Sequence, residues 1–191
     1  TAAAKATGLD KADFVVASTG VIGQTLNVEA IEAALPELAA GLKRSEAASD
    51  AAATAIMTTD TRKKEVALQV EIGGKTVTLG AIAKGSGMIH PNMGTMLCFV
   101  TTDCAITHEM LEEALRGVVK RTFNRVTIDG DTSTNDMCVV LANAMADNPL
   151  IEWKDAGYAA FEAALTELCT SLARQIAADG EGASRLVSCT V

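Results

Sequence analysis

The chain has 191 residues, a formal net charge of −8, 49% hydrophobic residues and only 3% aromatic residues. This length and hydrophobicity suit one folded domain with a substantial core and exclude an intrinsically disordered chain. The acidic balance and the scarcity of aromatic side chains argue against nucleic acid and anionic membranes as partners. No apolar run approaches the roughly 20 residues of a membrane helix, and no charged-then-apolar segment opens the chain, so we expect a soluble protein.

The first half of the chain predicts a strand followed by helices. The apolar, β-branched run 13–18 predicts a strand that ends in a turn at Thr19-Gly20. Alanine, leucine and glutamate dominate residues 28–57, which predicts a helical region. Interruptions of the helices are expected at two positions, Pro36 and Gly41.

Alternating apolar and polar residues over 65–80 predict a hairpin that turns at Gly73-Gly74. In chain order, the further predicted elements are a strand at 95–102, a helix at 107–122 capped by Thr107, a strand and loop at 123–131, a helix at 135–145, a helix at 154–178 and a strand at 184–191. Together these elements predict layered α and β structure with more antiparallel than parallel pairing.

Five cysteines occur without the close spacing of a metal site, and their number is odd. Several lie in apolar surroundings, which favours reduced thiols in the core. We therefore expect a reducing compartment, the cytoplasm. The cysteines are Cys98, Cys104, Cys138, Cys169 and Cys189.

The most informative segment is 84–97, KGSGMIHPNMGTML, which places a lysine and a glycine-rich loop before a Gly94-Thr95 bond. Cleavage of that bond would give Thr95 a free α-amine with a pKa of about 8, able to act as the base for its own hydroxyl. Gly94 permits the unusual backbone angles that a self-cleaving bond needs. Judged by its residues alone, a Gly-Thr bond at this position predicts an ordinary strand start.

Together with Thr19-Gly20, the motif TTDT at 58–61 and the segment FNRVTIDGDTSTND at 123–136, this segment resembles the bifunctional ornithine acetyltransferase and N-acetylglutamate synthase family of arginine biosynthesis. The resemblance runs over nearly the whole chain. It implies a mixed α/β fold of the α+β type, a layered α-β-β-α sandwich shared with related self-processing aminopeptidases. Family members are considerably longer, so we expect 1–191 to be a single partial domain, a central fragment without the family's N- and C-terminal regions.

The resemblance assigns catalytic roles to three residues. Thr95 matches the nucleophile, which is freed by self-cleavage between Gly94 and Thr95. Thr19 and Gly20 match the pair that holds the oxyanion, where each donor contributes roughly 3 kcal/mol. From the residues alone, Thr19-Gly20 is also compatible with an ordinary turn.

Substrate binding is assigned by the same resemblance to Thr61, Lys84, Thr95 and Glu181. The lysine would contact a substrate carboxylate, and Glu181 would bind the cationic amine of ornithine. Two neighbouring threonines of the TTDT motif compete with Thr61 for its role. Without the resemblance, Lys84 would be interpreted as a solvated surface lysine and Glu181 as an exposed carboxylate in a turn.

Clustered oxygen-bearing side chains at 129–136 raise the hypothesis of a metal site. The segment lacks the sixth-position glycine and the terminal glutamate of a calcium loop, and Asx or Ser/Thr turns explain it more simply. His90 and His108 are too isolated to form a catalytic pair. We therefore expect no metal ion.

The resemblance implies an acyltransferase that moves the acetyl group of N-acetylornithine to glutamate through an acetyl-threonine intermediate. It implies no cofactor, although some members accept acetyl-CoA as an acetyl donor. It also implies two protein partners, the complementary processed chain and further copies in a homo-oligomer. Two alternatives stay open: an amidohydrolase or aminopeptidase that releases the acyl group to water, and an uncleaved, inactive fragment that serves only as a structural or binding domain.

Overall fold

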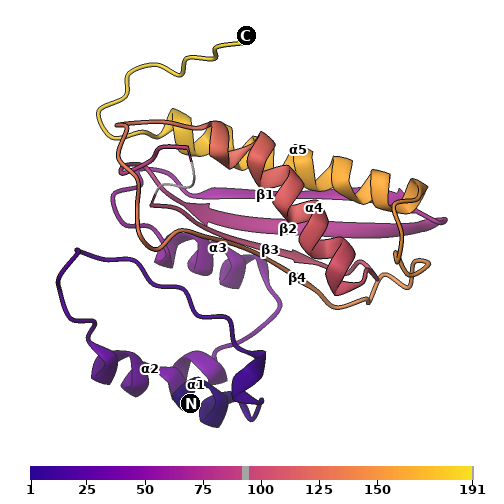
Figure 1. The fold of residues 1–191 in the computed structure, drawn as a ribbon. Helices are drawn as coiled ribbons and strands as arrows, with labels where there is room; N and C mark the ends of the chain where they lie inside the picture. Colours follow the sequence, from indigo (N-terminus) through magenta and orange to yellow (C-terminus); the bar gives the residue numbers. More distant parts are fainter. Residues whose placement is uncertain (92–94, 191) are drawn as a thin grey trace. The chain divides into compact units, whose positions relative to one another are not determined.

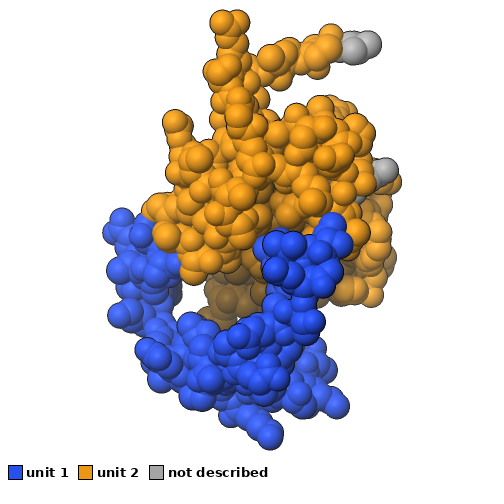
Figure 2. Space-filling model, turned by 90° about the vertical axis from the view of Figure 1, so that its left-hand side faces the viewer, with its two compact units in different colours: residues 1–52 blue, residues 53–191 orange. Residues whose placement is uncertain are grey.

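A computed structural model describes residues 1–91 and 95–190 of the chain. These residues divide into two compact units, Thr1–Ala52 and Ala53–Val191, which Figure 2 colours separately. None of the helices within the described ranges combines the length and the apolar composition that a membrane crossing requires.

The first unit is helical. It contains α1 (Ala2–Thr7), the short 3-10 helix η1 (Lys11–Asp13), α2 (Val28–Ala40) and the part of α3 (Glu46–Ala55) that precedes Ala53. The Asn27 side chain accepts the Ala30 N–H at 3.0 Å and so caps α2. The helix ends at Gly41, as predicted, but the expected interruption at Pro36 is wrong because that proline lies inside α2.

The second unit is built on a four-stranded sheet with strand order β1-β2-β3-β4 (Figure 1). Its first two strands form the predicted hairpin, and Gly73 and Gly74 turn it with φ angles of 59° and 76°, which favour glycine. The β2–β3 pair is also antiparallel, whereas β3 and β4 run parallel. The strands are β1 (Lys64–Ile72), β2 (Lys75–Lys84), β3 (Leu97–Thr102) and β4 (Met137–Ala142).

Two helices cover one face of this sheet (Figure 1). They are α4 (His108–Arg121), which continues into the 3-10 helix η2 (Phe123–Arg125), and α5 (Ala156–Ala178). The predicted cap Thr107 begins α4, and Asp155 begins α5 by accepting the Tyr158 N–H at 2.9 Å. Buried residues recur every three or four positions along α5 and pack against β1 and β2, which makes this helix the main cover of the core.

The mixed α/β class is confirmed, and so is the excess of antiparallel pairing. The described residues contribute one sheet and one helical layer to the predicted four-layered arrangement. All five cysteines are free thiols. Cys98, Cys104 and Cys169 are buried as expected, whereas Cys189 is exposed.

Four predicted elements are wrong. Residues 14–20 form no strand, and Val16 is 82% exposed, because no strand of the described sheet supplies hydrogen-bond partners for them. The segment 135–145 contains β4 instead of a helix, since pairing with β3 outweighs its small-residue composition. The remaining two are the strand within 123–131, where η2 and a loop lie, and the strand at 184–190, which has no regular structure.

Candidate active site

The second unit brings four predicted site residues to one end of the sheet. Thr61 precedes β1, Lys84 is the last residue of β2, Thr95 lies two residues before β3, and Glu181 follows α5. The prediction that Thr95 opens the strand is therefore slightly wrong, because β3 begins at Leu97. The loop 85–90 follows Lys84 and contacts both Thr95 and Glu181.

Lys84 is buried, with only 2% of the residue exposed, so its interpretation as a solvated surface lysine is wrong. Burial lowers the pKa of its ammonium group, and the nearby Lys64 acts in the same direction. The carboxylates of Asp60, Glu181 and Asp136 oppose this shift in pKa. A ligand carboxylate beside Lys84 would further stabilise the charged form.

Two glycines let Thr95 and Glu181 approach the loop. Gly85 has a φ of 154°, and a Cβ there would lie 3.2 Å from the Thr95 carbonyl oxygen. A Cβ at Gly87 would lie 2.6–2.9 Å from the carboxyl atoms of Glu181, closer than real contacts allow. The Glu181 N–H also donates to the Ser86 carbonyl oxygen at 2.7 Å. The φ of Gly85 thus favours glycine, and a side chain at position 87 would displace the Glu181 carboxyl group.

Thr95 is held by its backbone, with its N–H donating to the Met88 carbonyl oxygen at 2.5 Å. The next residue, Met96, donates its N–H to Asp136 Oδ1 at 2.8 Å. The Thr95 Oγ1 is buried and has no hydrogen-bond partner among the described residues.

Thr61 and Glu181 line a common cavity of about 380 Å³. The Thr61 N–H donates to Asp179 Oδ2 at 2.9 Å, and the Thr61 hydroxyl donates to the same carboxylate. Its competitor Thr59 also lines this cavity and shares a 2.6 Å hydrogen bond with the Ser86 hydroxyl. A larger cavity of about 800 Å³ also reaches Glu181 and is lined by four arginines. These are Arg121, Arg125, Arg174 and Arg185.

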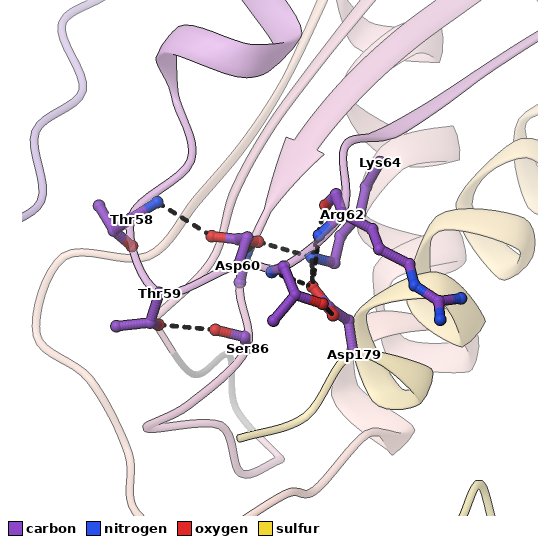
Figure 3. A network of polar contacts seen from close by, with 9 residues as sticks. Thr58, Thr59, Asp60, Arg62, Lys64, Ser86 and Asp179 are labelled. Carbon is purple, nitrogen blue, oxygen red and sulfur yellow. Dashed lines mark hydrogen bonds and ion pairs between the residues drawn. The ribbon is translucent and has the colours of Figure 1, made fainter. Parts of the chain in front are cut away.

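Behind these residues lies a buried ion triad, which we define as Lys64, Asp60 and Asp179 (Figure 3). The Lys64 Nζ lies 2.6 Å from Asp60 Oδ1 and 2.6 Å from Asp179 Oδ2. The three side chains are 1%, 0% and 6% exposed, in that order. The sequence prediction missed this triad. The four-residue spacing of Asp60 and Lys64 was the only signal, and Asp179 gave none beyond its place at a helix end.

The triad sets the charge state of its carboxylates. Burial raises the pKa of Asp60, but the Gly85 N–H and the Lys64 ammonium outweigh it, so this pKa lies below its usual range. Burial also raises the pKa of Asp179, yet hydrogen bonds from Lys64 and Thr61 lower it to about 2. Both groups are therefore anionic near neutral pH.

Two carboxylates of the acidic segment 129–136 accept hydrogen bonds from backbone N–H groups of the loop after β2 and of the residue before β3. Asp129 accepts the N–H groups of Met88 and Ile89, the second at 3.0 Å, while Asp136 accepts that of Met96. Within residues 1–91 and 95–190, no group of three or more His, Cys, Asp or Glu side chains is arranged to hold a metal ion.

Three predicted positions lie outside the described residues of the second unit. Thr19 and Gly20 lie in the other unit, in a segment without regular structure, and their role in the oxyanion hole stays a prediction. Gly94, on the other side of the predicted cleavage point, lies outside the described residues.

The fold and the site define a mixed α/β protein in which a glycine-rich loop gathers a buried lysine, a carboxylate and a threonine with a buried hydroxyl. The ArgJ family model matches residues 1–191. The chain belongs to the ArgJ family, which confirms the resemblance found in its motifs.

Among its relatives is the "Arginine biosynthesis bifunctional protein ArgJ" of Symbiobacterium thermophilum, 54% identical over 189 residues, or 99% of this chain and 46% of the relative. The protein of the same name from Bacillus subtilis is 48% identical over 184 residues, or 96% and 44% of the two chains. A crystal structure of arginine biosynthesis bifunctional protein argJ from Bacillus halodurans is 50% identical, with a TM-score of 0.44 over 46% of this chain and 41% of that one. The chain thus spans less than half the length of its relatives.

Proposed function

We propose that the complete gene product containing this chain is a self-processing acyltransferase of arginine biosynthesis, which moves an acetyl group from N-acetylornithine to glutamate. The observation that carries this proposal is the ArgJ family match over residues 1–191. The geometry supports it, because Thr61, Lys84 and Glu181 gather around the loop that contacts Thr95. Family membership favours this transfer over simple hydrolysis.

In the proposed mechanism, the Thr95 hydroxyl first attacks the Gly94 carbonyl carbon and converts the peptide bond into an ester, which water hydrolyses to a Gly94 carboxylate and a free Thr95 amine. That amine takes the proton from Thr95 Oγ as the oxygen attacks the acetyl carbonyl carbon. The N–H groups or hydroxyl of Thr19-Gly20 stabilise the oxyanion until the C–N bond breaks. Ornithine leaves with the proton, and the acetyl group remains as an ester on Thr95.

In the second half of the cycle, the amine of glutamate attacks this ester and restores Thr95. Lys84 would bind the α-carboxylate that both amino acids carry, and Glu181 would bind the side-chain ammonium of ornithine. Acetyl-CoA, as an alternative donor, would form the same ester with loss of the thiol. We further propose that the two processed chains stay together, assemble into a homo-oligomer and act in the cytoplasm.

Intact mass spectrometry of the complete protein tests the first step. We expect the wild type to give two pieces that part at Gly94-Thr95, and Thr95→Ala to remain whole. Thr101→Ala, which changes an exposed threonine on β3, the strand that follows Thr95, is the matched control and should be cleaved like the wild type. Cleavage of Thr95→Ala at the same bond would remove Thr95 from the mechanism.

A transfer assay tests the second step. Ornithine release from N-acetylornithine should require glutamate and should yield N-acetylglutamate. Equal release without glutamate, with free acetate as the product, would instead identify a hydrolase. An uncleaved wild type that releases no ornithine would identify an inactive binding domain.

A further inference from the structure

The ion triad of Lys64, Asp60 and Asp179 needs an explanation beyond stability. All three charges are removed from water, and the cost of desolvating them offsets much of the attraction between them. An apolar cluster of similar volume would stabilise the fold comparably. What charged hydrogen bonds add is direction, because their donors and acceptors must be aligned.

Each carboxylate of the triad also holds a backbone group of the site. Asp60 Oδ1 accepts the Gly85 N–H at 2.7 Å, directly after Lys84, and Asp60 Oδ2 accepts the Thr58 N–H at 3.2 Å. Asp179 accepts the Thr61 N–H and hydroxyl. Lys64 therefore connects two carboxylates that hold the turn at 58–62 and the loop after β2.

The end of α5 closes this arrangement. Glu181 lies two residues after Asp179, and its N–H donates to the Ser86 carbonyl oxygen at 2.7 Å. The three segments 58–62, 85–87 and 179–181 contain no regular helix or strand. Asp179 is fixed to the end of α5, because its N–H donates to the carbonyl oxygens of Gln175 and Ile176. Hydrogen bonds of the triad and of Ser86 join the three segments to one another.

We propose that Lys64, Asp60 and Asp179 are positioning residues, which hold Thr61, Lys84 and Glu181 in one arrangement around an amino-acid substrate. This inference rests on the proposed function for the identity of that substrate. The triad itself does not touch the reacting atoms. It acts through the backbone of residues that do.

Two variants of the complete protein test the proposal. Lys64→Met removes the centre of the triad and leaves two buried carboxylates unpaired, so it also lowers the melting temperature. The second variant, Lys64→Met/Asp60→Asn/Asp179→Asn, removes all three charges of the triad with little change in shape and leaves the buried Lys84 with the carboxylates of Glu181 and Asp136 as its remaining charge partners. Lys154→Met is the control, because Lys154 pairs with Glu113 at the surface.

Hydrogen exchange of single amides is the decisive readout, since it needs no turnover. In the folded triple variant we expect exchange at Thr61, Gly85 and Glu181 to become about tenfold faster, while amides within β1 to β3 keep their wild-type rates. We also expect a rise of about tenfold in KM for both N-acetylornithine and glutamate. Lys154→Met should change neither quantity.

Wild-type exchange rates at these three amides in either folded variant would overturn the proposal. A uniform acceleration across the sheet would overturn it as well, because that outcome marks a purely structural role. The wild type alone gives a second test that no folding failure can block. Its three amides should open together at one common rate, and three unrelated rates would contradict the proposal.

The two proposals fail in different ways. Absence of acetyl transfer by the wild type would refute the proposed function and leave the exchange result intact. Normal transfer by the triple variant, with unchanged KM values, would refute the positioning role and leave the proposed function intact.

Discussion

Gly87 shows how a single hydrogen atom sets the position of a site residue. A Cβ at this position would overlap the Glu181 carboxyl group, with contacts of 2.6–2.9 Å. We predict that Gly87→Ala displaces Glu181 and raises KM for N-acetylornithine by about tenfold. A misplaced charge-assisted hydrogen bond costs about 1 to 2 kcal/mol of binding free energy, which corresponds to about a tenfold loss of affinity. Steady-state kinetics of the complete protein measures it.

The matched control is Gly80→Ala on β2. A Cβ there would have its nearest neighbour, Thr101 Oγ1, at 3.9 Å, which is an ordinary contact. We expect wild-type kinetics from this variant. A KM for N-acetylornithine that is equally unchanged in Gly87→Ala would mean that Glu181 does not bind this substrate.

The carboxylates of the ion triad predict a loss of stability in acid. The pKa of Asp179 is lowered to about 2 and that of Asp60 also lies below its usual range, so the folded state favours both ionised forms. The resulting stabilisation is fully present above about pH 5 and is lost as the pH falls from about 4 to 2. For Asp179 the loss is on the order of 2 kcal/mol of unfolding free energy.

Urea denaturation at a series of pH values measures this loss. Asp179→Asn should be less stable than the wild type at pH 7 and should show a shallower decline between pH 4 and 2, because one titrating group is gone. Equal slopes for the two proteins would show that Asp179 does not carry the acid sensitivity.

At the residue scale, the sequence allowed Thr61, Lys84, Thr95 and Glu181 to be predicted as parts of one site because they belong to recognisable motifs. Asp179 could not be predicted in the same way. Its bonds to Thr61 and Lys64 span 118 and 115 positions of the chain, and no local pattern encodes such a pairing.

At the scale of elements, α5 is the helix on which the core depends, and Asp155 begins it. We predict that Asp155→Ala lowers the unfolding free energy by about 1 kcal/mol, because the Tyr158 N–H would lose its acceptor. Thermal unfolding measures the change. Asp155→Ser, which retains a capping oxygen, should recover most of it, and an equally large loss in that variant would exclude capping as the cause.

Elements with strong local signals were predicted correctly, and those that depend on distant partners were not. The Gly73-Gly74 turn and the Thr107 cap are fixed by their own residues. In contrast, β4 is a strand because β3 lies beside it, and the small-residue composition of the segment 135–145 alone favoured a helix. The run 13–18 shows the reverse case: its β-branched residues favoured a strand, but the described part of the chain offers no strand with which it pairs.

At the scale of the whole molecule, the predicted cleavage point separates elements that the fold keeps joined. The hairpin β1-β2 lies before Gly94, and β3, β4, α4 and α5 lie after Thr95. Six residue pairs, from Leu79↔Thr102 to Lys84↔Leu97, connect β2 to β3 across this point. The buried face of α5 also packs on β1.

Cleavage inside this continuous sheet would change the molecularity of folding. The uncut chain folds in a unimolecular reaction. The processed pieces could refold only by meeting in solution, so their refolding is a second-order reaction and their unfolding equilibrium depends on protein concentration. The melting temperature of the processed wild type should therefore rise more steeply with protein concentration than that of the uncut Thr95→Ala, which lacks the added dissociation of two pieces. Once cut, the protein would owe its persistence to a slow rate of unfolding, since after unfolding dilution would favour two separate chains over the native pair.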